Sequence, residues 1–354
     1  NVSFVPGWDC HGLPIELNVE QKSGKPNKDI SAKDFRAKCR DYANQQIAIQ
    51  KKDFKRLGVL ADWNNPYKTM DFSFEAGIIR ALSEIVKSGH LVKGDKPVYW
   101  CPDCNSALAE AEVEYKDKTS SSIDFLFQME TSNANEIFNT SVDESLKTSF
   151  LSWTTTPWTI PGNVALSVNS NLDYSLIEVN LDNSKQYLII CKELLDSVME
   201  RCSIKNYTIL STKPGSIFES IEAKHPYFDR KSTVILGDHV TTEMGTGIVH
   251  TAPAHGLEDF HASNKYKLDI VNHVGSDGRF IDTANDFSGM NLEEANKKSI
   301  EMLEERSNLL SKDSYQHSFP HCWRHKTPLF FRATPQWFIS VSYTHLTLPT
   351  MAIV

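Results

Sequence analysis

The chain contains no hydrophobic run long enough to cross a membrane and no recognisable secretory signal. A membrane-spanning helix needs about 18 to 20 consecutive apolar residues, and no stretch of the sequence approaches that length. The opening residues, NVSFVPGWDCHG, lack the basic start and the apolar segment of a signal peptide. They read like the interior of a domain, so we expect the natural chain to begin further upstream.

Cysteine is sparse, with seven in 354 residues, and the number is odd. Two of them, Cys101 and Cys104, form a CxxC motif. This usage is typical of reduced thiols in a cytoplasmic protein and argues against the disulfide frame of a secreted domain. The formal charge of −8 argues against a basic surface over the whole protein, but it leaves room for a local nucleic-acid groove.

Several common catalytic signatures are also missing. Neither GxxxxGK[ST] nor GxGxxG occurs, so the usual glycine-rich phosphate cradles are absent from the sequence. No Ser-His-Asp or Cys-His signature indicates a covalent nucleophile. The HxxxxH spacing of His250 and His255 has neither the spacing nor the glutamate of a zinc protease.

Hydrophobic periodicity predicts two helices in the first quarter of the chain. Residues 31–57 have a capping-box pattern at Ser31 and Asp34, and Gly58 follows where a helix would end. A second helix is predicted for residues 73–88 from apolar residues at helical spacing.

The pattern changes after Tyr115, where short apolar runs alternate with turn residues. Such runs predict strands, and helical spacing predicts helices at 192–202, 256–267 and 292–310. We therefore expect a β-rich domain at residues 116–312, inserted in an α/β framework.

Three segments carry polar groups in unusual density. In PGWDCHGLPIE (6–16), the carboxylate of Asp9 could bind an ammonium group or simply cap the next turn. In WTTTPWTIPGN (153–163), three threonines on a strand would place hydroxyls on both faces, as a polar pocket or as ordinary strand residues. In GTGIVHTAPAHGLEDF (245–260), a histidine could be a base or a steric wall, and Asp259 could bind an amine. The alternative is that both histidines are hydrogen-bonded within the protein and that the acid begins a helix.

A fourth set consists of two pairs with CxxC-like spacing. Cys101 and Cys104 precede the expected insert, and Cys322 and His325 follow it more than 200 residues later. Two cysteine or histidine pairs can supply the four ligands of a tetrahedral zinc. Two hydrogen-bonded turns without metal are the alternative, and His321 is a second choice for the fourth ligand.

Together these segments resemble class I aminoacyl-tRNA synthetases of the isoleucine, valine and leucine group, and within it the isoleucine enzymes. GWDCHGLPIE and WTTTPWT carry this resemblance, together with WCPDCNSALAEAEVEY (100–115) and CWRHKTPLFFRATPQWF (322–338). The valine and leucine enzymes typically have arginine where this chain has Thr156. The resemblance covers about residues 1–340, and the tail after it, 341–354, reads as foreign sequence.

The resemblance implies an α/β fold in which a partial Rossmann-like catalytic domain is interrupted by a β-rich editing (connective peptide) domain. The implied parts are a partial aminoacylation domain and stalk (1–115), an editing domain (116–312) and a return segment into the catalytic domain (313–340). The family's HIGH and KMSKS motifs for ATP do not occur in the sequence. We therefore expect this stretch alone to lack a complete site for activating isoleucine.

The resemblance also assigns roles to individual residues. Asp9 would bind the ammonium of isoleucine, in a loop with His11 and Gly12. Asp259 would hold the ammonium of a misattached valine, and His250 would exclude isoleucine. The residues expected to line the editing pocket and to orient water or ester are Thr154, Thr155, Thr156 and Asn163.

The implied reaction of the complete enzyme joins isoleucine to tRNA(Ile) with ATP and hydrolyses misacylated Val-tRNA, in a cytoplasmic monomer with no membrane partner. Zinc at Cys101, Cys104, Cys322 and His325 is a possible cofactor. Two alternatives remain: the chain could be an inert tRNA-docking or structural fragment, or its amino acid could be valine or leucine, which WTTTPWT disfavours.

Overall fold

The computed structural model describes residues 3–181 and 184–339, and the expected foreign tail lies outside these residues. Within the described residues, the chain packs as two compact units, one at 94–336 and a smaller one that combines 3–93 with 337–339. The expected limits at 115/116 and 312/313 remain a prediction, and the strands on either side of the insert pack with it in one unit. Among the described residues, no helix is both long enough and apolar enough to cross a membrane.

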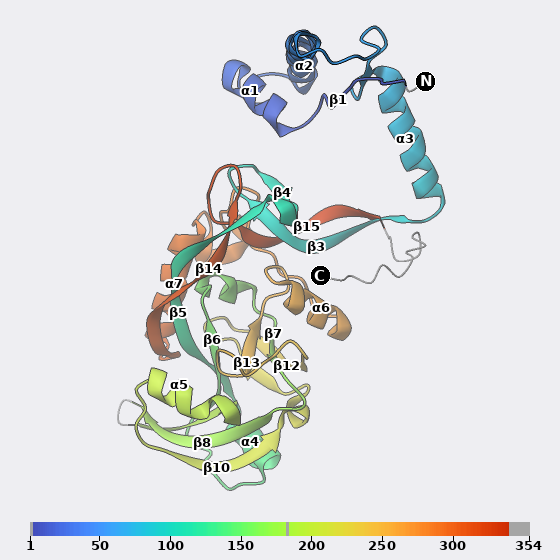
Figure 1. Cartoon of the computed structure of the whole chain (residues 1–354). Helices are drawn as coiled ribbons and strands as arrows, with labels where there is room; N and C mark the ends of the chain where they lie inside the picture. Colours follow the sequence, from blue (N-terminus) through green and yellow to red (C-terminus); the bar gives the residue numbers. More distant parts are fainter. Residues whose placement is uncertain (1–2, 182–183, 340–354) are drawn as a thin grey trace. The chain divides into compact units, whose positions relative to one another are not determined.

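The smaller unit is mixed α/β (Figure 1). Two short parallel strands pair through Gly7↔Tyr67 and Trp8↔Lys68. Its elements are β1 (Gly7–Trp8), α1 (Leu13–Ser23), α2 (Ala32–Arg56), β2 (Tyr67–Lys68) and α3 (Phe72–Lys87).

The two helices predicted here are confirmed to within one residue at each end. The Ser31 hydroxyl accepts a hydrogen bond from the Asp34 N–H at 3.1 Å, which satisfies a free donor in the first turn of α2. Gly58, just past the end, has φ of +84°, a conformation that glycine adopts without strain. The predicted apolar face of α3 remains largely exposed, and Ile79 is 68% exposed.

The large unit contains three sheets. The six-stranded sheet has the order β10-β8-β9-β6-β5-β14, the four-stranded sheet β11-β12-β7-β13, and the three-stranded sheet β15-β3-β4. The strands are β3 (Leu91–Cys101), β4 (Ser106–Leu108), β5 (Val113–Met129), β6 (Thr148–Thr154), β7 (Ala165–Val168), β8 (Asp173–Leu181), β9 (Ser184–Cys191), β10 (Tyr207–Pro214), β11 (Glu222–Lys224), β12 (Lys231–Leu236), β13 (Ile248–Thr251), β14 (Leu309–Cys322) and β15 (Phe330–Ile339).

Helices fill the connections between these strands. The α-helices are α4 (Thr131–Phe138), α5 (Leu195–Arg201), α6 (Leu257–Tyr266) and α7 (Leu292–Glu305), and the short 3₁₀ helices include η2 (Pro157–Gly162). The helix predicted for 292–310 was too long. Ser307 has φ of +54°, which ends the helical path, and the chain enters β14 at Leu309. The predicted β-rich region and the mixed α/β class are otherwise confirmed.

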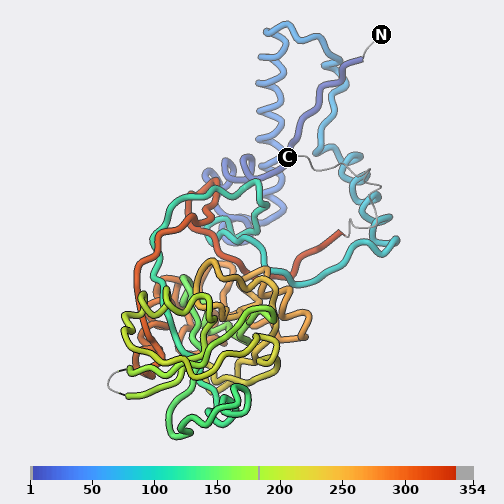
Figure 2. The backbone as a smooth tube through the Cα atoms, turned by 60° about the horizontal axis from the view of Figure 1, so that its bottom comes forward, coloured from blue at the N-terminus to red at the C-terminus, as the bar shows by residue number. Residues whose placement is uncertain are grey.

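Among the described strands, the longest pairing joins β5 to β14, which run side by side in both views (Figure 1, Figure 2). The antiparallel register extends from Val113↔Cys322 to Phe125↔Leu309. Toward its inner end, β5 also pairs with β6 and contributes fully buried side chains such as Phe125 and Phe127 to the main core. The pairing therefore brings the two ends of the insert together and anchors them in its core.

A buried ion pair lies beside this core. The carboxylate of Asp124, on β5, is only 3% exposed and accepts two hydrogen bonds from Arg201, at 2.6 and 2.9 Å. The same guanidinium donates to the carbonyl oxygen of Gly245 at 3.3 Å. Arg201 thus ties the end of α5 to β5 and to the loop before β13.

We expect Arg201→Ala to lower the free energy of unfolding by about 3 kcal/mol, because it leaves a buried carboxylate without its partner. Urea denaturation followed by circular dichroism measures the change. The matched control is Lys185→Ala, which breaks an exposed ion pair with Glu178 and should cost less than about 1 kcal/mol. Equal effects of the two substitutions would contradict this account of the buried pair.

Candidate functional site

A cavity of about 260 Å³ lies where the end of β6 meets β13 and the start of α6. Its walls carry polar groups from two of the segments singled out in the sequence, together with the backbone of a glycine-containing loop. The lining residues are Trp153, Thr154, Thr155, Thr156, Thr159, Met244, Gly245, Thr246, Gly247, Ile248, Val249, His250, Ala252, His255 and Asp259.

The three consecutive threonines all line this cavity. In a regular strand, their side chains would point alternately to opposite faces. The alternation is not kept here because β6 ends at Thr154, and Thr156 already leads into the 3₁₀ helix η2. The hydroxyls of Thr154 and Thr156 lie 3.3 Å apart, and the Thr156 N–H donates to the Thr154 hydroxyl at 3.1 Å. A regular strand would also place these two hydroxyls on one face, and the turn brings them close enough to interact.

His250 lies in β13 with both ring nitrogens already paired. Its Nδ1 lies 2.9 Å from the Asn163 side-chain Nδ2, an obligatory donor, so Nδ1 is the acceptor. Its Nε2 then carries the proton and donates to the Thr159 hydroxyl at 2.8 Å, which donates in turn to the Thr156 carbonyl. Burial lowers the pKa of His250 to about 3, so the ring is neutral at physiological pH.

Asn163, which was expected to line the cavity, is fully buried and lies behind His250. Its side-chain N–H groups reach the Ala165 carbonyl and the His250 ring, and its carbonyl oxygen accepts from Ser232. Asn163 therefore orients the histidine ring and has no cavity surface of its own.

Asp259 lies in the first turn of α6 and reaches the cavity from the other side. Its Oδ2 accepts a hydrogen bond from the Ala252 N–H at 2.9 Å. Burial raises the pKa of this carboxyl to about 6, although that N–H opposes the shift. Because burial disfavours the charged form of this carboxyl, the carboxylate gains from pairing with a cationic ligand.

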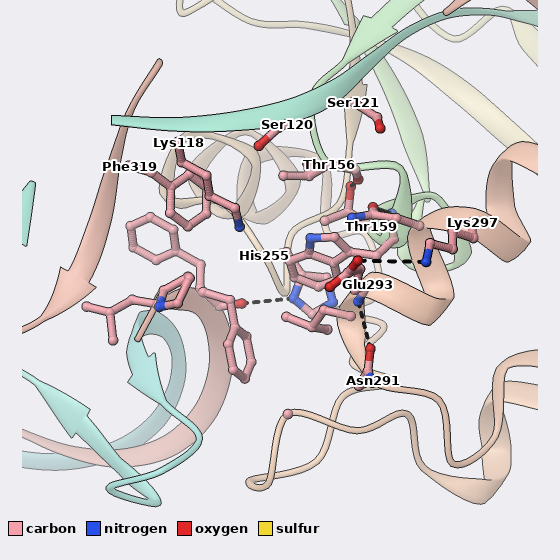
Figure 3. A pocket seen from close by; sticks show the side chains of 18 of the residues that line it. Lys118, Ser120, Ser121, Thr156, Thr159, His255, Asn291, Glu293, Lys297 and Phe319 are labelled. Atoms are coloured by element: carbon pink, nitrogen blue, oxygen red, sulfur yellow. Dashed lines mark hydrogen bonds and ion pairs between the residues drawn. The ribbon is translucent and has the colours of Figure 1, made fainter. Parts of the chain in front are cut away.

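A second and larger cavity, of about 1090 Å³, adjoins the first and shares Thr156, Thr159 and His255 with it. Figure 3 shows Lys118 and Phe319 on the β5–β14 pair at one side of this cavity. The other side is formed by the start of α7, where Glu293 and Lys297 form an ion pair at 3.8 Å.

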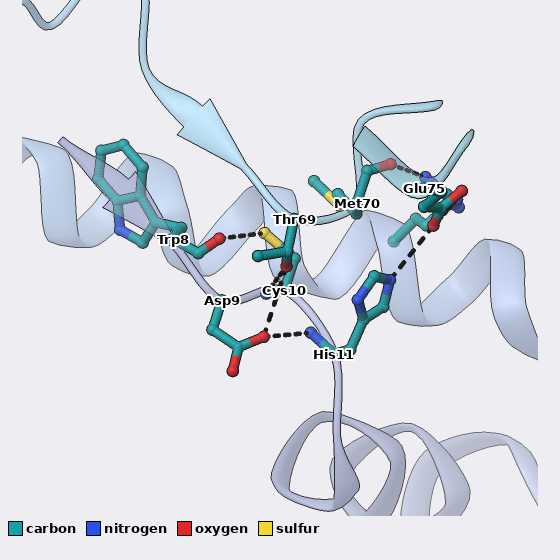
Figure 4. A network of polar contacts seen from close by, with 8 residues as sticks. Trp8, Asp9, Cys10, His11, Thr69, Met70 and Glu75 are labelled. Atoms are coloured by element: carbon teal, nitrogen blue, oxygen red, sulfur yellow. Dashed lines mark hydrogen bonds and ion pairs between the residues drawn. The ribbon is translucent and has the colours of Figure 1, made fainter. Parts of the chain in front are cut away.

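The Asp9 loop belongs to the smaller unit (Figure 4). The Asp9 Oδ1 lies 3.4 Å from both the His11 N–H and the Thr69 hydroxyl, and the carboxylate is exposed beside a cavity of about 220 Å³. His11 contacts Glu75 at 3.3 Å. Gly12 has φ of +105°, which the turn into α1 requires.

The two distant cysteine and histidine pairs converge in the large unit, as the zinc hypothesis requires. The ligand atoms of Cys101, Cys104, Cys322 and His325 all lie within 4.8 Å of one another. The Sγ atoms of Cys104 and Cys322 are 3.7 Å apart, close to the separation of about 3.8 Å expected between thiolates bound tetrahedrally at about 2.3 Å. The residues therefore fit a zinc ion. His321 lies outside this cluster and pairs with the Phe319 carbonyl.

Sequence reasoning did not assign roles to Thr159 and His255, which also line the cavity. Thr159 stands in the same WTTTPWT motif as the three threonines. Gly247 packs closely against β9, since a Cβ at this position would lie 2.3 Å from the Cys191 Cβ.

Comparison with known proteins extends the resemblance seen in the sequence. The family model for class I tRNA synthetases (I, L, M and V) matches residues 1–351. An isoleucine–tRNA ligase of Shewanella baltica (strain OS155) is 54% identical over 338 residues, and one of Pseudoalteromonas atlantica is 52% identical over 341 residues. Each alignment covers 96% of this chain, which spans only 36% of the length of either relative.

Solved structures with some likeness to the chain include two leucyl-tRNA synthetase editing domains. The P. falciparum cytosolic domain is 13% identical, with a TM-score of 0.44, and covers 54% of this chain and 99% of its own. The P. knowlesi domain is also 13% identical, with a TM-score of 0.44, and covers 55% of this chain and 97% of its own. On the strength of the family model and the isoleucine–tRNA ligase relatives, the chain belongs to the class I tRNA synthetases of the isoleucine, leucine, methionine and valine group.

Proposed function

We propose that the chain is part of an isoleucine–tRNA ligase and that its large unit hydrolyses valine wrongly attached to tRNA. The observation that carries the proposal is one cavity with Asp259 on one side and the paired, neutral His250 on another. The names of the relatives support the amino acid, and the threonine segment supports isoleucine over valine or leucine.

A separate hydrolytic site is needed because binding alone cannot distinguish valine from isoleucine well enough. Valine fits a pocket made for isoleucine, and one missing methylene changes binding by only about 1–3 kcal/mol, a general range for which this pair is itself the standard example. A separate hydrolytic site can reject the larger amino acid by size and remove the smaller one after attachment.

The cavity residues divide this task. Asp259 would bind the ammonium of the attached valine through a charge-assisted hydrogen bond. The hydroxyls of Thr154, Thr155 and Thr156 would orient the ester and the attacking water. The His250 ring, held by Asn163 and Thr159 with no free nitrogen, would act as a wall against the extra methylene of isoleucine. An aminoacyl ester is already activated, so positioned water suffices without a covalent nucleophile.

For the complete ligase we propose the family's reaction, in which ATP activates isoleucine before its transfer to tRNA. Asp9 would hold the ammonium of isoleucine in the smaller unit, with His11 and Gly12 shaping the same loop. Thr69 and the paired Glu75 and Arg40 stabilise this loop from the side.

We also propose that Cys101, Cys104, Cys322 and His325 hold a structural zinc ion. The ion would cross-link the two segments that enter and leave the insert. The free energy of zinc binding would then contribute to the folding free energy of the large unit.

Asp259→Asn should lower kcat/KM for Val-tRNA hydrolysis by about 100-fold, because a neutral amide gives up the charge-assisted contact with the ammonium. The rate of hydrolysis is measured by the release of labelled valine from purified Val-tRNA. The matched control is Glu258→Gln, which removes an exposed charge from the neighbouring position of α6. An Asp259→Asn chain that deacylates at the parent rate would disprove the assignment.

His250→Ala should allow Ile-tRNA to be hydrolysed while Val-tRNA hydrolysis continues, because the substitution removes the wall and leaves the ammonium contact intact. Deacylation of the two charged tRNAs is measured in parallel. A second variant, His250→Gln, keeps a polar side chain against Asn163 and guards against misfolding. If both variants fold and still reject Ile-tRNA, another residue excludes isoleucine.

The pH profile should follow Asp259. Its carboxyl has a pKa of about 6, raised above the ordinary value by burial, and only the ionised form binds the ammonium. We expect kcat/KM for Val-tRNA to fall about tenfold per pH unit below pH 6, after subtraction of spontaneous hydrolysis. His250, with its pKa lowered to about 3, remains neutral across this range. A profile flat down to pH 4.5 would contradict the role of the carboxylate.

The purified chain should contain one zinc ion, and Cys104→Ser should lose it. Plasma mass spectrometry after exhaustive dialysis in a reducing buffer gives the stoichiometry. The control is Cys39→Ser, which alters a thiol of α2 in the smaller unit. A parent chain that stays free of zinc after supplementation would exclude the metal, although the four side chains cluster.

A further inference from the structure

Two histidines line the smaller cavity, and they differ in what they can offer a ligand. Both nitrogens of His250 are paired within the protein. His255 has only one partner among the described residues, the Phe331 carbonyl, which lies 2.9 Å from its Nδ1. The second nitrogen of His255, Nε2, makes no hydrogen bond to any residue in the described part of the chain.

The single contact of His255 determines its tautomer. A carbonyl oxygen can only accept, so Nδ1 must carry the proton and Nε2 must present its lone pair. Burial lowers the pKa of this ring to about 4, against the carbonyl contact, so the lone pair is available at neutral pH. His255 is therefore a neutral acceptor.

Packing holds this acceptor in place. The ring meets the indole of Trp158 edge to face, with centroids 4.8 Å apart and an interplanar angle of 68°. On the backbone side, the His255 N–H donates to the Ala252 carbonyl at 2.9 Å, while the Ala252 N–H donates to Asp259. The same short segment thus positions the carboxylate and the histidine.

His255 also lies where the two cavities meet, because it lines both of them together with Thr156 and Thr159. Figure 3 shows these three side chains in the larger cavity. In the proposed function, the smaller cavity takes the amino acid and its ester. The group next to the ester is the terminal ribose, whose second, unesterified hydroxyl is a hydrogen-bond donor. It is the donor of the substrate closest to the reacting carbonyl, apart from the ammonium that Asp259 would bind.

We propose that Nε2 of His255 accepts a hydrogen bond from the free ribose hydroxyl of the terminal nucleotide and so positions the ester for hydrolysis. This inference rests on the proposed editing function. It assigns His255 to the nucleotide part of the substrate, whereas Asp259 and His250 recognise the amino acid.

The test is a double-substitution cycle on binding, using analogues that cannot be hydrolysed. One analogue carries valine as an amide on 2′-amino-2′-deoxyadenosine, with the 3′ hydroxyl free, and the other is its 3′-deoxy counterpart. A second pair of analogues, in which the 2′ and 3′ substituents are exchanged, represents the other isomer of the ester. Calorimetry measures Kd for the full 354-residue chain and for three variants: His255→Phe, His255→Gln, and His261→Phe as an exposed control in the same region.

We expect the parent chain to bind the hydroxyl analogue about three- to tenfold more tightly than the deoxy one, the range for one neutral hydrogen bond. His255→Phe should remove this preference by weakening the binding of the hydroxyl analogue alone. His255→Gln, whose side-chain oxygen can accept, should retain part of it, and His261→Phe should retain all of it. If His255 had only a structural role, its substitution would weaken the binding of both analogues equally.

The outcomes separate the two claims. If the parent shows no preference, or His255→Phe keeps it, the contact is disproved whether or not Val-tRNA is hydrolysed. If the preference depends on His255 but the chain does not deacylate Val-tRNA, the contact stands and the hydrolytic function fails. A parent chain that binds neither member of either pair overturns both.

Discussion

The antiparallel pairing of β5 with β14 is the constraint on which the rest of the large unit depends. It joins segments that are 209 residues apart at Val113↔Cys322 and 184 residues apart at Phe125↔Leu309. Closing so long a loop costs conformational entropy, and two features of the paired strands offset that cost. At one end, apolar side chains of β5 enter the main core, and at the other, the cysteine and histidine pairs converge.

The small cavity shows how buried polar groups specify a site by their pairing. His250, Asn163, Thr159 and Ser232 form a closed network, in which each buried polar atom meets a partner. Leaving any one of them unpaired would cost about 1–3 kcal/mol, so the network fixes the His250 ring in a single orientation. The surface that it presents to the cavity is consequently rigid and has no free nitrogen.

Against this neutral wall, Asp259 is the one strongly perturbed acid of the cavity. Its raised pKa and the lowered pKa values of His250 and His255 have a common cause, the removal of water from ionisable groups. The cavity thus has a group that gains by meeting a cation and two histidine rings that remain uncharged. This asymmetry would orient a ligand with one ammonium and an uncharged ester.

Local patterns determined the elements that depend on neighbours in the chain. The Ser31 cap and Gly58 limit α2, and alternating apolar runs marked most of the strands. The α7 prediction extended too far because Ser307 turns the chain by adopting a positive φ, which its residue type does not reveal. The sequence predicts that the three consecutive threonines lie on a strand, whereas β6 ends at Thr154 and the chain then enters η2.

By itself the sequence determined the family, the mixed α/β class with its β-rich insert, and the short segments that carry the chemistry, because these are written in contiguous motifs. Only the tertiary structure decided which groups of those motifs are free to act. His250 and His255 look alike in sequence, but Asn163 and Thr159 occupy both nitrogens of the first, and Phe331 occupies only one of the second. The reason is physical: a hydrogen-bond partner distant in sequence decides whether a side chain holds the fold together or faces a ligand.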